Sequence, residues 1–245
     1  MEATVYRDAV RLHSSALSAA EKRLLIRIAR RLPRWVNSDH LTALGAFGMA
    51  LAGASYWLSS ISRTGLVLAI VCLGVNWFGD SLDGTLARVR DCQRPRYGFY
   101  VDHVLDSLGA LFLLAGLGAS GYMSPMVAIA LLAAYYLLSI EIYLATSVLR
   151  TFRMAYFGMG PTELRIVLAF GTMMLMVHPH AEIAGRTFLL FDVGGVVAAV
   201  GLVIVFLVSA ARNMRALYLE EPARPASGAR PEERAPFDRA SASAN

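Results

Sequence analysis

Long apolar segments separated by short polar connections make up most of the sequence between residues 41 and 213. A helix needs about 20 residues to cross the hydrocarbon core of a bilayer, and each segment approaches or exceeds that length. The segments are too long and too continuously apolar for the alternating strands of a membrane β-barrel. The pattern predicts an all-α polytopic membrane protein with six transmembrane helices, at residues 41–60, 65–87, 98–120, 124–148, 162–178 and 192–213.

A basic amphipathic segment precedes the first of these spans. The four residues from Ser18 to Glu21 form a capping-box pattern, which predicts the start of a helix, and Pro33 predicts its end. Basic residues surround a single apolar face made by Leu24, Leu25, Ile28 and Leu32. Such a pattern is typical of a helix lying in the interface of an anionic membrane, although a helix packed on another protein surface would show it too.

The composition agrees with a membrane location. Hydrophobic residues make up 56% of the chain and charged residues 17%, against roughly 45–50% and about 25% in soluble globular proteins. The net charge of +5 comes from basic residues scattered at the ends of segments, which disfavours nucleic-acid binding. The two cysteines, Cys72 and Cys92, are too few for a disulfide framework or a zinc site.

The distribution of arginine predicts the orientation of the spans. The connections at 88–97 and 149–161 are rich in arginine, whereas the loops on the opposite side contain only Arg63 and Arg186. Because lysine and arginine accumulate on the cytoplasmic side, both arginine-rich connections and both termini are expected in the cytoplasm. The sequence therefore predicts an integral protein of the cytoplasmic (inner) membrane.

Three regions follow from these patterns. Residues 1–40 form an N-terminal segment with the amphipathic interfacial helix, and residues 41–213 form the six-helix membrane domain. Residues 214–245 are expected to form a disordered cytoplasmic tail, because residues 221–245 lack apolar periodicity and are rich in proline, alanine, arginine and serine.

Four aspartates stand where the second span ends and the third begins. Asp80 and Asp83 are three residues apart, so they share one helix face. Asp102 and Asp106 are four residues apart and also share a face. Two helices joined by a short loop are antiparallel neighbours, so the two pairs can meet near the membrane surface.

A cluster of this kind is costly unless its charge is neutralised. A charged aspartate within a span costs about 2.5–3.5 kcal/mol on insertion scales, and clustered carboxylates repel one another. Two divalent cations would neutralise four carboxylates, and an all-oxygen ligand set favours Mg²⁺ or Mn²⁺. A pair of such cations is the usual clamp for in-line phosphoryl displacement, so the residues predict a two-metal site for phosphoryl transfer.

Small and basic residues lie beside the aspartates. Gly84 and Ala87 continue the stripe of the first aspartate pair and leave the helix surface open for a flat ligand such as a nucleotide base. Arg88 can bind a phosphate through two parallel hydrogen bonds. Gly98 allows close approach of backbone or ligand.

The order and spacing of these residues resemble the signature of the CDP-alcohol phosphotransferase (CDP-alcohol phosphatidyltransferase) family, D-x2-D-G-x2-A-R followed by G-x3-D-x3-D. All eight specified positions match, namely Asp80, Asp83, Gly84, Ala87, Arg88, Gly98, Asp102 and Asp106. A second short motif of the family, Pro-Asn followed by Thr, is matched only in part, by Asn37 and Thr42 without the proline.

The resemblance implies a membrane enzyme that moves a phosphatidyl (phosphoryl-alcohol) group from a CDP-linked donor to an acceptor alcohol and releases CMP. It implies that Asp80, Asp83 and Asp102 are the main metal ligands. It implies that Asp106 also lies at the metals and serves as general base. The CDP-binding elements would be Gly84, Ala87 and Arg88, joined by Gly98.

CDP-diacylglycerol is the expected donor, because the site opens sideways to lipid at a membrane surface. A CDP-aminoalcohol donor with diacylglycerol as acceptor uses the same motif and is the alternative. A magnesium-dependent membrane prenyltransferase and a cation transporter are rivals that also use clustered carboxylates. The acceptor stays open among glycerol phosphate, inositol, inositol phosphate, serine and aminoalcohols. The expected partners are the lipid donor, the small alcohol and membrane lipids, without nucleic acid, and the sequence is compatible with a homodimer.

Four polar residues outside the motif are candidate acceptor ligands at the cytoplasmic cavity: Arg150, Arg153, Glu163 and Arg165. The alternatives are that the arginines act as positive-inside charges and that Glu163 belongs to ordinary helix initiation.

Other polar and aromatic residues within the spans have two interpretations each. Glu141 lies inside the fourth span, where an acid is either functional or held by a structural partner. His103 points away from the motif aspartates and is expected to pack between helices. Tyr56 and Trp57, near the end of a span, are expected to anchor the helix at the membrane interface. His178 and His180 are expected to be solvated in an outer loop between the fifth and sixth spans.

Overall fold

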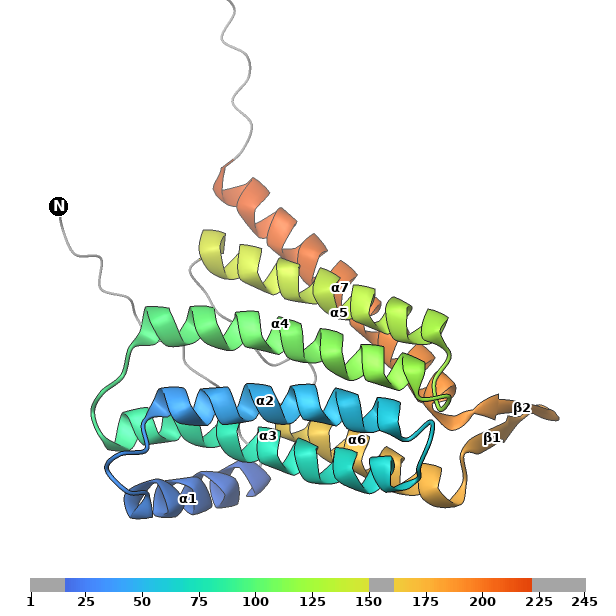
Figure 1. Ribbon diagram of the computed structural model, residues 1–245. Helices are drawn as coiled ribbons and strands as arrows, with labels where there is room; N and C mark the ends of the chain where they lie inside the picture. Colours follow the sequence, from blue (N-terminus) through green and yellow to red (C-terminus); the bar gives the residue numbers. More distant parts are fainter. Residues whose placement is uncertain (1–15, 150–160, 222–245) are drawn as a thin grey trace, which may run out of the picture.

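The computed structural model of the protein describes residues 16–149 and 161–221. These residues form seven helices and one two-stranded hairpin (Figure 1). In chain order the elements are α1 (Ala16–Arg31), α2 (Ser38–Leu58), α3 (Thr64–Val89), α4 (Pro95–Ala119), α5 (Pro125–Leu149), α6 (Pro161–Val177), β1 (His180–Ile183), β2 (Arg186–Leu189) and α7 (Leu190–Glu220). The helices α2 to α7 coincide with the predicted spans, which confirms the all-α polytopic membrane fold.

Most of these spans are helices long enough to cross the hydrocarbon core of a bilayer. Five helices, α2, α3, α4, α5 and α7, are each long and apolar enough to cross a membrane. The helix α6 contains 17 residues and is about 26 Å long, slightly short of a hydrocarbon core of about 30 Å. It begins where the described part of the chain resumes. The helix α7 ends at Glu220, beyond the predicted limit of residue 213, and the rest of the predicted tail, residues 222–245, lies outside the described residues.

The helix α2 lies at the centre of the bundle. It packs against α3 and α4, α4 in turn packs against α5, and α5 packs against α7, whereas α6 lies along α3 (Figure 1). Backbones approach closely where small residues face another helix. A Cβ at Gly79 of α3 would lie 2.6 Å from the carbonyl oxygen of Leu41 in α2, and one at Gly116 of α4 would clash with the backbone of Gly53 in α2. The start of α2 is therefore held directly against the C-terminal half of α3.

The last turn of α2 corrects one prediction. Tyr56 is fully buried and is not an interface anchor. Its hydroxyl group is 2.5 Å from Oγ1 of Thr172 in α6, and its ring meets Phe191 of α7 edge-on. Trp57 is 59% exposed, in agreement with its predicted position at the interface. Successive residues of a helix point about 100° apart, so adjacent aromatics near a helix end can face the protein and the lipid respectively.

The helix α1 rests on the bundle through part of its apolar face. Leu25 and Ala29 are buried against Leu82 and Leu86 of α3. Leu24 is 45% exposed, and the basic side chains from Lys22 onward are exposed as well. The helix therefore combines the two arrangements that its sequence predicted: one edge packs on protein, and the remaining surface is open to a membrane interface.

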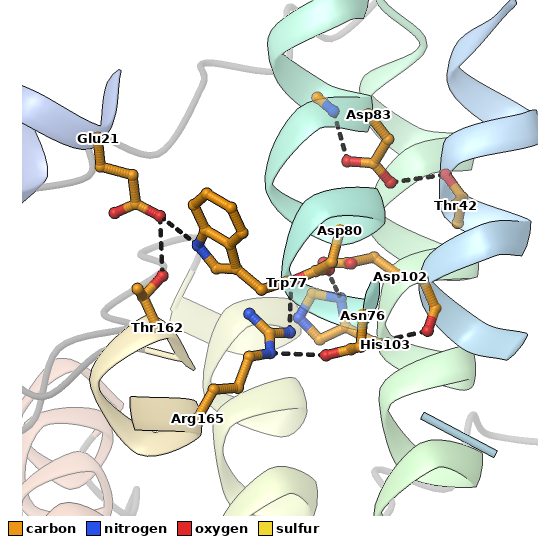
Figure 2. Close-up of polar contacts among 12 residues, drawn as sticks. Glu21, Thr42, Asn76, Trp77, Asp80, Asp83, Asp102, His103, Thr162 and Arg165 are labelled. Atoms are coloured by element: carbon orange, nitrogen blue, oxygen red, sulfur yellow. Dashed lines mark hydrogen bonds and ion pairs between the residues drawn. The ribbon is translucent and has the colours of Figure 1, made fainter. Parts of the chain in front are cut away.

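The predicted capping box of α1 is wrong. The helix begins at Ala16, ahead of the predicted cap at Ser18. Oε1 of Glu21 accepts hydrogen bonds from Nε1 of Trp77 (2.8 Å) and from Oγ1 of Thr162 (3.1 Å) (Figure 2). Hydrogen bonds to a charged group are the stronger ones, and these two tie α1 to both α3 and α6.

The connection between α6 and α7 contains a short hairpin, and His178 and His180 in it are exposed, as expected. The strands pair antiparallel from His180 opposite Leu189 to Ile183 opposite Arg186. The two residues of its turn, Ala184 and Gly185, have φ angles of +52° and +75°. Positive φ at both positions gives the turn the twist of a β-hairpin. The sequence Ala-Gly is not a strong signal for such a turn, so local composition indicated only a loop.

Glu141 is held by hydrogen-bonding partners in another helix, which confirms its structural interpretation. It is 8% exposed in the middle of α5. Its Oε1 accepts hydrogen bonds from Oγ of Ser209 (2.9 Å) and Nδ2 of Asn213 (2.6 Å), both in α7. An acid within the apolar part of a span is stabilised by donors of this kind, and here they join α5 to α7.

Candidate active site

Three of the four motif aspartates converge at one end of the bundle. Asp80 lies in the C-terminal half of α3, and Asp102 and Asp106 lie in the N-terminal half of α4. One carboxylate oxygen from each of the three lies within 4.8 Å of the others. The helices α3 and α4 each pack against α2 and not closely against each other, so the predicted direct pairing of α3 with α4 is wrong. Asp80 nevertheless meets Asp102 and Asp106 beside α2.

Asp83, the fourth aspartate, is held by the start of α2. Its Oδ2 accepts a hydrogen bond of 2.6 Å from Oγ1 of Thr42, and its Oδ1 accepts one from the backbone NH of Gly84 (Figure 2). Oγ of Ser38 donates to the backbone carbonyl of Asp83 at 2.9 Å. Asp83 lines the same pocket as the other three but does not belong to their group of oxygens within 4.8 Å.

A small pocket, with a cavity volume of about 20 Å³, opens between α2, α3 and α4 at this end. Carboxylates occupy its α3 and α4 sides, and small or apolar residues occupy most of its α2 side. The lining residues are Thr42, Gly45, Ala46 and Met49 of α2, Asn76, Asp80 and Asp83 of α3, and Asp102, Leu105, Asp106 and Gly109 of α4. The charged groups of the pocket therefore all come from α3 and α4.

Arg165 of α6 reaches into this site. Its Nη2 donates a hydrogen bond of 2.6 Å to Oδ2 of Asp80, and its Nε donates one of 2.6 Å to Oδ1 of Asn76 (Figure 2). Its side chain is 11% exposed. The sequence placed Arg165 near the cavity, but it did not identify Asp80 as the partner. Asn76 was not singled out, although a polar residue one turn before Asp80 within an apolar run was a signal for it.

Of the residues expected to bind CDP, Gly84, Ala87 and Arg88 lie on α3 and Gly98 lies near the start of α4. A Cβ added at Gly84 would lie 3.5 Å from Nη1 of Arg88. Apart from the backbone of α3 itself, no other group of the described chain would lie within 4 Å of it. Nη2 of Arg88 donates to Oγ1 of Thr85 at 3.2 Å. A Cβ at Gly98 would meet open space, and Ala87 is half-buried on the same helix as Gly84. Gly84 therefore leaves room beside Arg88 and is not packed against a neighbouring helix.

Two arginines of the connection between α3 and α4 hold the chain around the site. Nη2 of Arg90 donates to the carbonyl oxygens of Leu32 (3.0 Å) and Pro33 (2.9 Å), and its Nη1 donates to that of Val36. Arg94 forms an ion pair with Asp39 in the first turn of α2. The sequence accounted for both arginines only as positive-inside charges. The backbone carbonyls that Arg90 binds have no sequence signature, so these contacts were not predictable.

His103 and Asn37 have local roles. The ring of His103 lies 4.1 Å from that of Phe99 and 4.9 Å from that of Tyr143, and its Nδ1 donates to the carbonyl of Phe99 at 2.7 Å. The ring contacts agree with the predicted packing role, but Nδ1 also lies 3.9 Å from Oδ2 of Asp102, so His103 does not point away from the motif aspartates as expected. Asn37 caps α2, because its side chain accepts a hydrogen bond of 2.9 Å from the backbone NH of His40. Of the second short motif, only Thr42 therefore reaches the aspartates.

Of the candidate acceptor ligands, two lie in the described part of the chain. Glu163 is in the first turn of α6 and is half-buried, and Arg165 follows it. Arg150 and Arg153 lie outside the described residues.

Comparison with known proteins identifies the family. The family model for CDP-alcohol phosphatidyltransferases matches residues 35–214. The chain belongs to the CDP-alcohol phosphatidyltransferase family. Comparison with curated proteins gives no match. Among solved structures, the chain is similar to the phosphatidylinositol phosphate synthase of Mycobacterium tuberculosis with CDP-DAG bound, with 21% identity, a TM-score of 0.56 and coverage of 80% of this chain and 94% of that one.

The aspartate cluster fits the divalent cations on which CDP-alcohol phosphatidyltransferases generally depend. Asp80, Asp102 and Asp106 offer only oxygen ligands, which favour Mg²⁺ or Mn²⁺ over softer metals. Three carboxylates this close also repel one another unless positive charge offsets theirs. Arg165 supplies one such charge at Asp80. The donor set and its unbalanced negative charge are therefore suited to a hard divalent cation.

Proposed function

We propose that the protein transfers the phosphatidyl group of CDP-diacylglycerol to a small acceptor alcohol and releases CMP. The observation that carries this proposal is the convergence of Asp80, Asp102 and Asp106 next to the uncovered helix surface at Gly84 and Arg88. A phosphoryl-transfer site and a nucleotide surface then lie side by side. The CDP-DAG bound to the similar solved structure supports the choice of donor.

The nucleotide end of the donor lies along α3 in this proposal. The guanidinium of Arg88, next to Gly84, binds the donor diphosphate through two parallel hydrogen bonds. The missing side chains at Gly84 and Gly98 and the small one at Ala87 leave space for the cytidine and its phosphates. The acyl chains then extend toward the surrounding lipid.

Asp106 acts as the general base. Its carboxylate lines the pocket and accepts the proton of the acceptor hydroxyl. The oxygen of that hydroxyl forms a bond to the phosphorus that carries diacylglycerol, and the bond from this phosphorus to the CMP oxygen breaks. Two divalent cations, held by Asp80, Asp83, Asp102 and Asp106, would supply the charge that stabilises the transferring phosphoryl group and the CMP leaving group.

The acceptor is expected to enter from the cytoplasmic side, near the first turn of α6. Glu163 and Arg165 belong to that turn and the next, and Arg150 and Arg153 precede it in the sequence. Glu163 and the two preceding arginines are the residues we propose for acceptor binding. The two hydrogen bonds of Arg165 favour a role at Asp80 for that residue instead.

The purified protein is expected to release CMP from CDP-diacylglycerol with one member of an acceptor panel. The panel contains glycerol phosphate, inositol, inositol phosphate, serine and ethanolamine, each assayed with Mg²⁺ and Mn²⁺. A parallel reaction supplies CDP-choline or CDP-ethanolamine as donor and diacylglycerol as acceptor. CMP release only in the parallel reaction would replace the donor by a CDP-aminoalcohol, and no CMP from any combination would refute the function. Prenyl diphosphate turnover or metal flux without nucleotide would point to the two rival functions.

We further propose that the protein lies in the cytoplasmic (inner) membrane with its site facing the cytoplasm, because the arginine-rich connection between α3 and α4 borders the aspartates. Cys92 in this connection is exposed. In a Cys72→Ala variant, a membrane-impermeant maleimide is therefore expected to label Cys92 only after the membrane is opened.

A second cysteine position provides the control for this labelling. Ile61, in the connection between α2 and α3 at the other end of the bundle, is 80% exposed. In a Cys72→Ala, Cys92→Ser, Ile61→Cys variant, the same reagent is expected to label intact cells. Labelling of Cys92, but not of Ile61→Cys, in intact cells would reverse the proposed orientation.

A further inference from the structure

A chain of hydrogen bonds runs from α2 through α3 to α6 and ends on Asp80. Nδ2 of Asn76 donates to the carbonyl oxygen of Gly45 at 2.9 Å. Nε of Arg165 donates to Oδ1 of Asn76, and Nη2 of Arg165 donates to Oδ2 of Asp80, both at 2.6 Å (Figure 2). The guanidinium that contacts Asp80 is therefore itself held by a side chain anchored on the backbone of α2.

Chemistry permits only one arrangement of this chain. A carbonyl oxygen can only accept, so the NH₂ group of Asn76 must face Gly45 and its oxygen must face Arg165. The guanidinium is planar and its donors diverge at fixed angles, so one orientation satisfies both Asn76 and Asp80. Asn76 is 5% exposed and the Arg165 side chain 11% exposed, which keeps water from competing for these bonds.

We infer that Arg165 and Asn76 are positioning residues that set the rotation of the Asp80 carboxylate for a divalent cation. The inference rests on the proposed metal site. Carboxylates that bind metals are commonly oriented by hydrogen bonds from neighbouring groups, and losing such a partner weakens metal binding. Because Arg165 engages Oδ2 of Asp80, it holds that carboxylate in one rotation toward the pocket. Arg165 thus acts through Asp80 and does not contact the acceptor.

Positive charge alone would not require this arrangement. A cation near three carboxylates would lower their mutual repulsion from many positions and without an amide partner. Asn76 carries no charge, yet it occupies the second donor of Arg165 and fixes its plane. The two explanations differ at Asn76: a positioning role needs its side chain, whereas a charge-offset role does not.

Mn²⁺ binding to the purified protein, followed by electron paramagnetic resonance without any donor lipid, tests the inference. Asn76→Ala leaves every charge in place, and Arg165→Lys keeps the charge but loses the planar fork. Each is expected to weaken Mn²⁺ affinity about tenfold. Because both changes break the same chain, the double variant is expected to bind about as weakly as either single one.

A hydrogen bond elsewhere on α6 provides the matched control. Thr172→Val removes the bond to Tyr56 without touching the pocket. It is expected to lower the melting temperature and leave Mn²⁺ affinity unchanged. Should Asn76→Ala fail to fold, Asn76→Ser, which keeps a small polar side chain, replaces it and carries the same expectation.

The outcomes separate this inference from the metal site on which it rests. Wild-type affinity in folded Asn76→Ala and Arg165→Lys overturns the inference, provided that Asp102→Asn still loses Mn²⁺. Tighter binding in Arg165→Gln together with wild-type binding in Asn76→Ala also overturns it, because Arg165 would then act through charge alone. Absence of Mn²⁺ binding to the wild-type protein, or unchanged binding in Asp102→Asn, overturns the metal site and the inference together.

Discussion

Asp102→Asn is expected to abolish CMP release while the protein still inserts and folds. The substitution removes one negative charge from the three carboxylates that lie within 4.8 Å of one another. Losing an outer hydrogen-bonding partner of a metal ligand typically costs about 10–100-fold, so loss of a ligand itself is expected to exceed a hundredfold. The same loss is expected for the wild-type protein in a chelator, with recovery on adding Mg²⁺ or Mn²⁺.

Asp102 is a better position for this test than Asp80, because the His103 ring nitrogen that faces it is 3.9 Å away. Asp80 forms an ion pair with Arg165, whose side chain is 11% exposed, and removing one partner of a buried pair is itself destabilising. An Asp80→Asn variant is therefore expected to be inactive, but with a lower melting temperature as well. Activity has to be read beside thermal stability for each variant.

An aspartate at the opposite end of the bundle provides the control. Asp192, in the first turn of α7, accepts hydrogen bonds from the backbone NH (2.7 Å) and Oγ (2.5 Å) of Ser124. Asp192→Asn is expected to lose about 1 kcal/mol of stability and to keep its activity. Equal loss of activity in Asp192→Asn and Asp102→Asn would mean that the assay reports folding and not the site.

An Asp83→Asn variant tests whether all four aspartates hold two cations. The Asp83 carboxylate accepts hydrogen bonds from Thr42 and Gly84 and lies outside the tight group of three. If all four aspartates hold two cations, Asp83→Asn is expected to be as inactive as Asp102→Asn. Substantial CMP release from Asp83→Asn would rule out the two-cation assignment. A single cation held by the other three aspartates would still agree with that result.

Gly84→Val is expected to leave the bundle folded and to weaken CDP-donor binding at least tenfold. No neighbouring helix of the described chain lies within 4 Å of a Cβ at this position, and the nearest group is the guanidinium of Arg88. Valine also has a slightly higher helix propensity than glycine. The added side chain would occupy the space that the nucleotide needs and displace Arg88. Thermal stability and donor affinity, both measured in detergent, report the two effects.

Arg88→Lys is expected to weaken the donor in the same direction. An ammonium group cannot reproduce the two parallel hydrogen bonds of the guanidinium. Hydrogen bonds to charged groups are worth about 1.5–3 kcal/mol, so the loss of one corresponds to roughly a tenfold to hundredfold weaker Kd.

Gly79→Ala is the matched control for Gly84→Val. The two glycines lie on the same helix, but a Cβ at Gly79 would lie 2.6 Å from the Leu41 carbonyl oxygen. Overpacking of this kind costs about 1–3 kcal/mol, so Gly79→Ala is expected to melt at a lower temperature. Instability of Gly84→Val to the same degree would show that Gly84 serves helix packing. A stable Gly84→Val protein with unchanged donor affinity would place the nucleotide elsewhere.

The sequence alone determined the spans and the spacing within each aspartate pair. A backbone in lipid satisfies its polar groups within its own helix, so a continuous apolar run of sufficient length is enough to predict a span. Likewise, residues three or four apart share a helix face whatever the helix packs against. Asp80 with Asp83, and Asp102 with Asp106, are predictable in this way because the rule involves a single helix.

Only the tertiary structure decided which side chains meet across helices. Arg165 and Asp80 are 85 residues apart, and Thr42 and Asp83 are 41 apart. Periodicity gives the face on which a residue lies, but the neighbour of that face depends on how closely the backbones approach. Glycines set that approach between α2 and α3, and their effect depends on both helices at once. The aspartates could therefore be identified from the sequence, whereas the residues that orient them required the packed bundle.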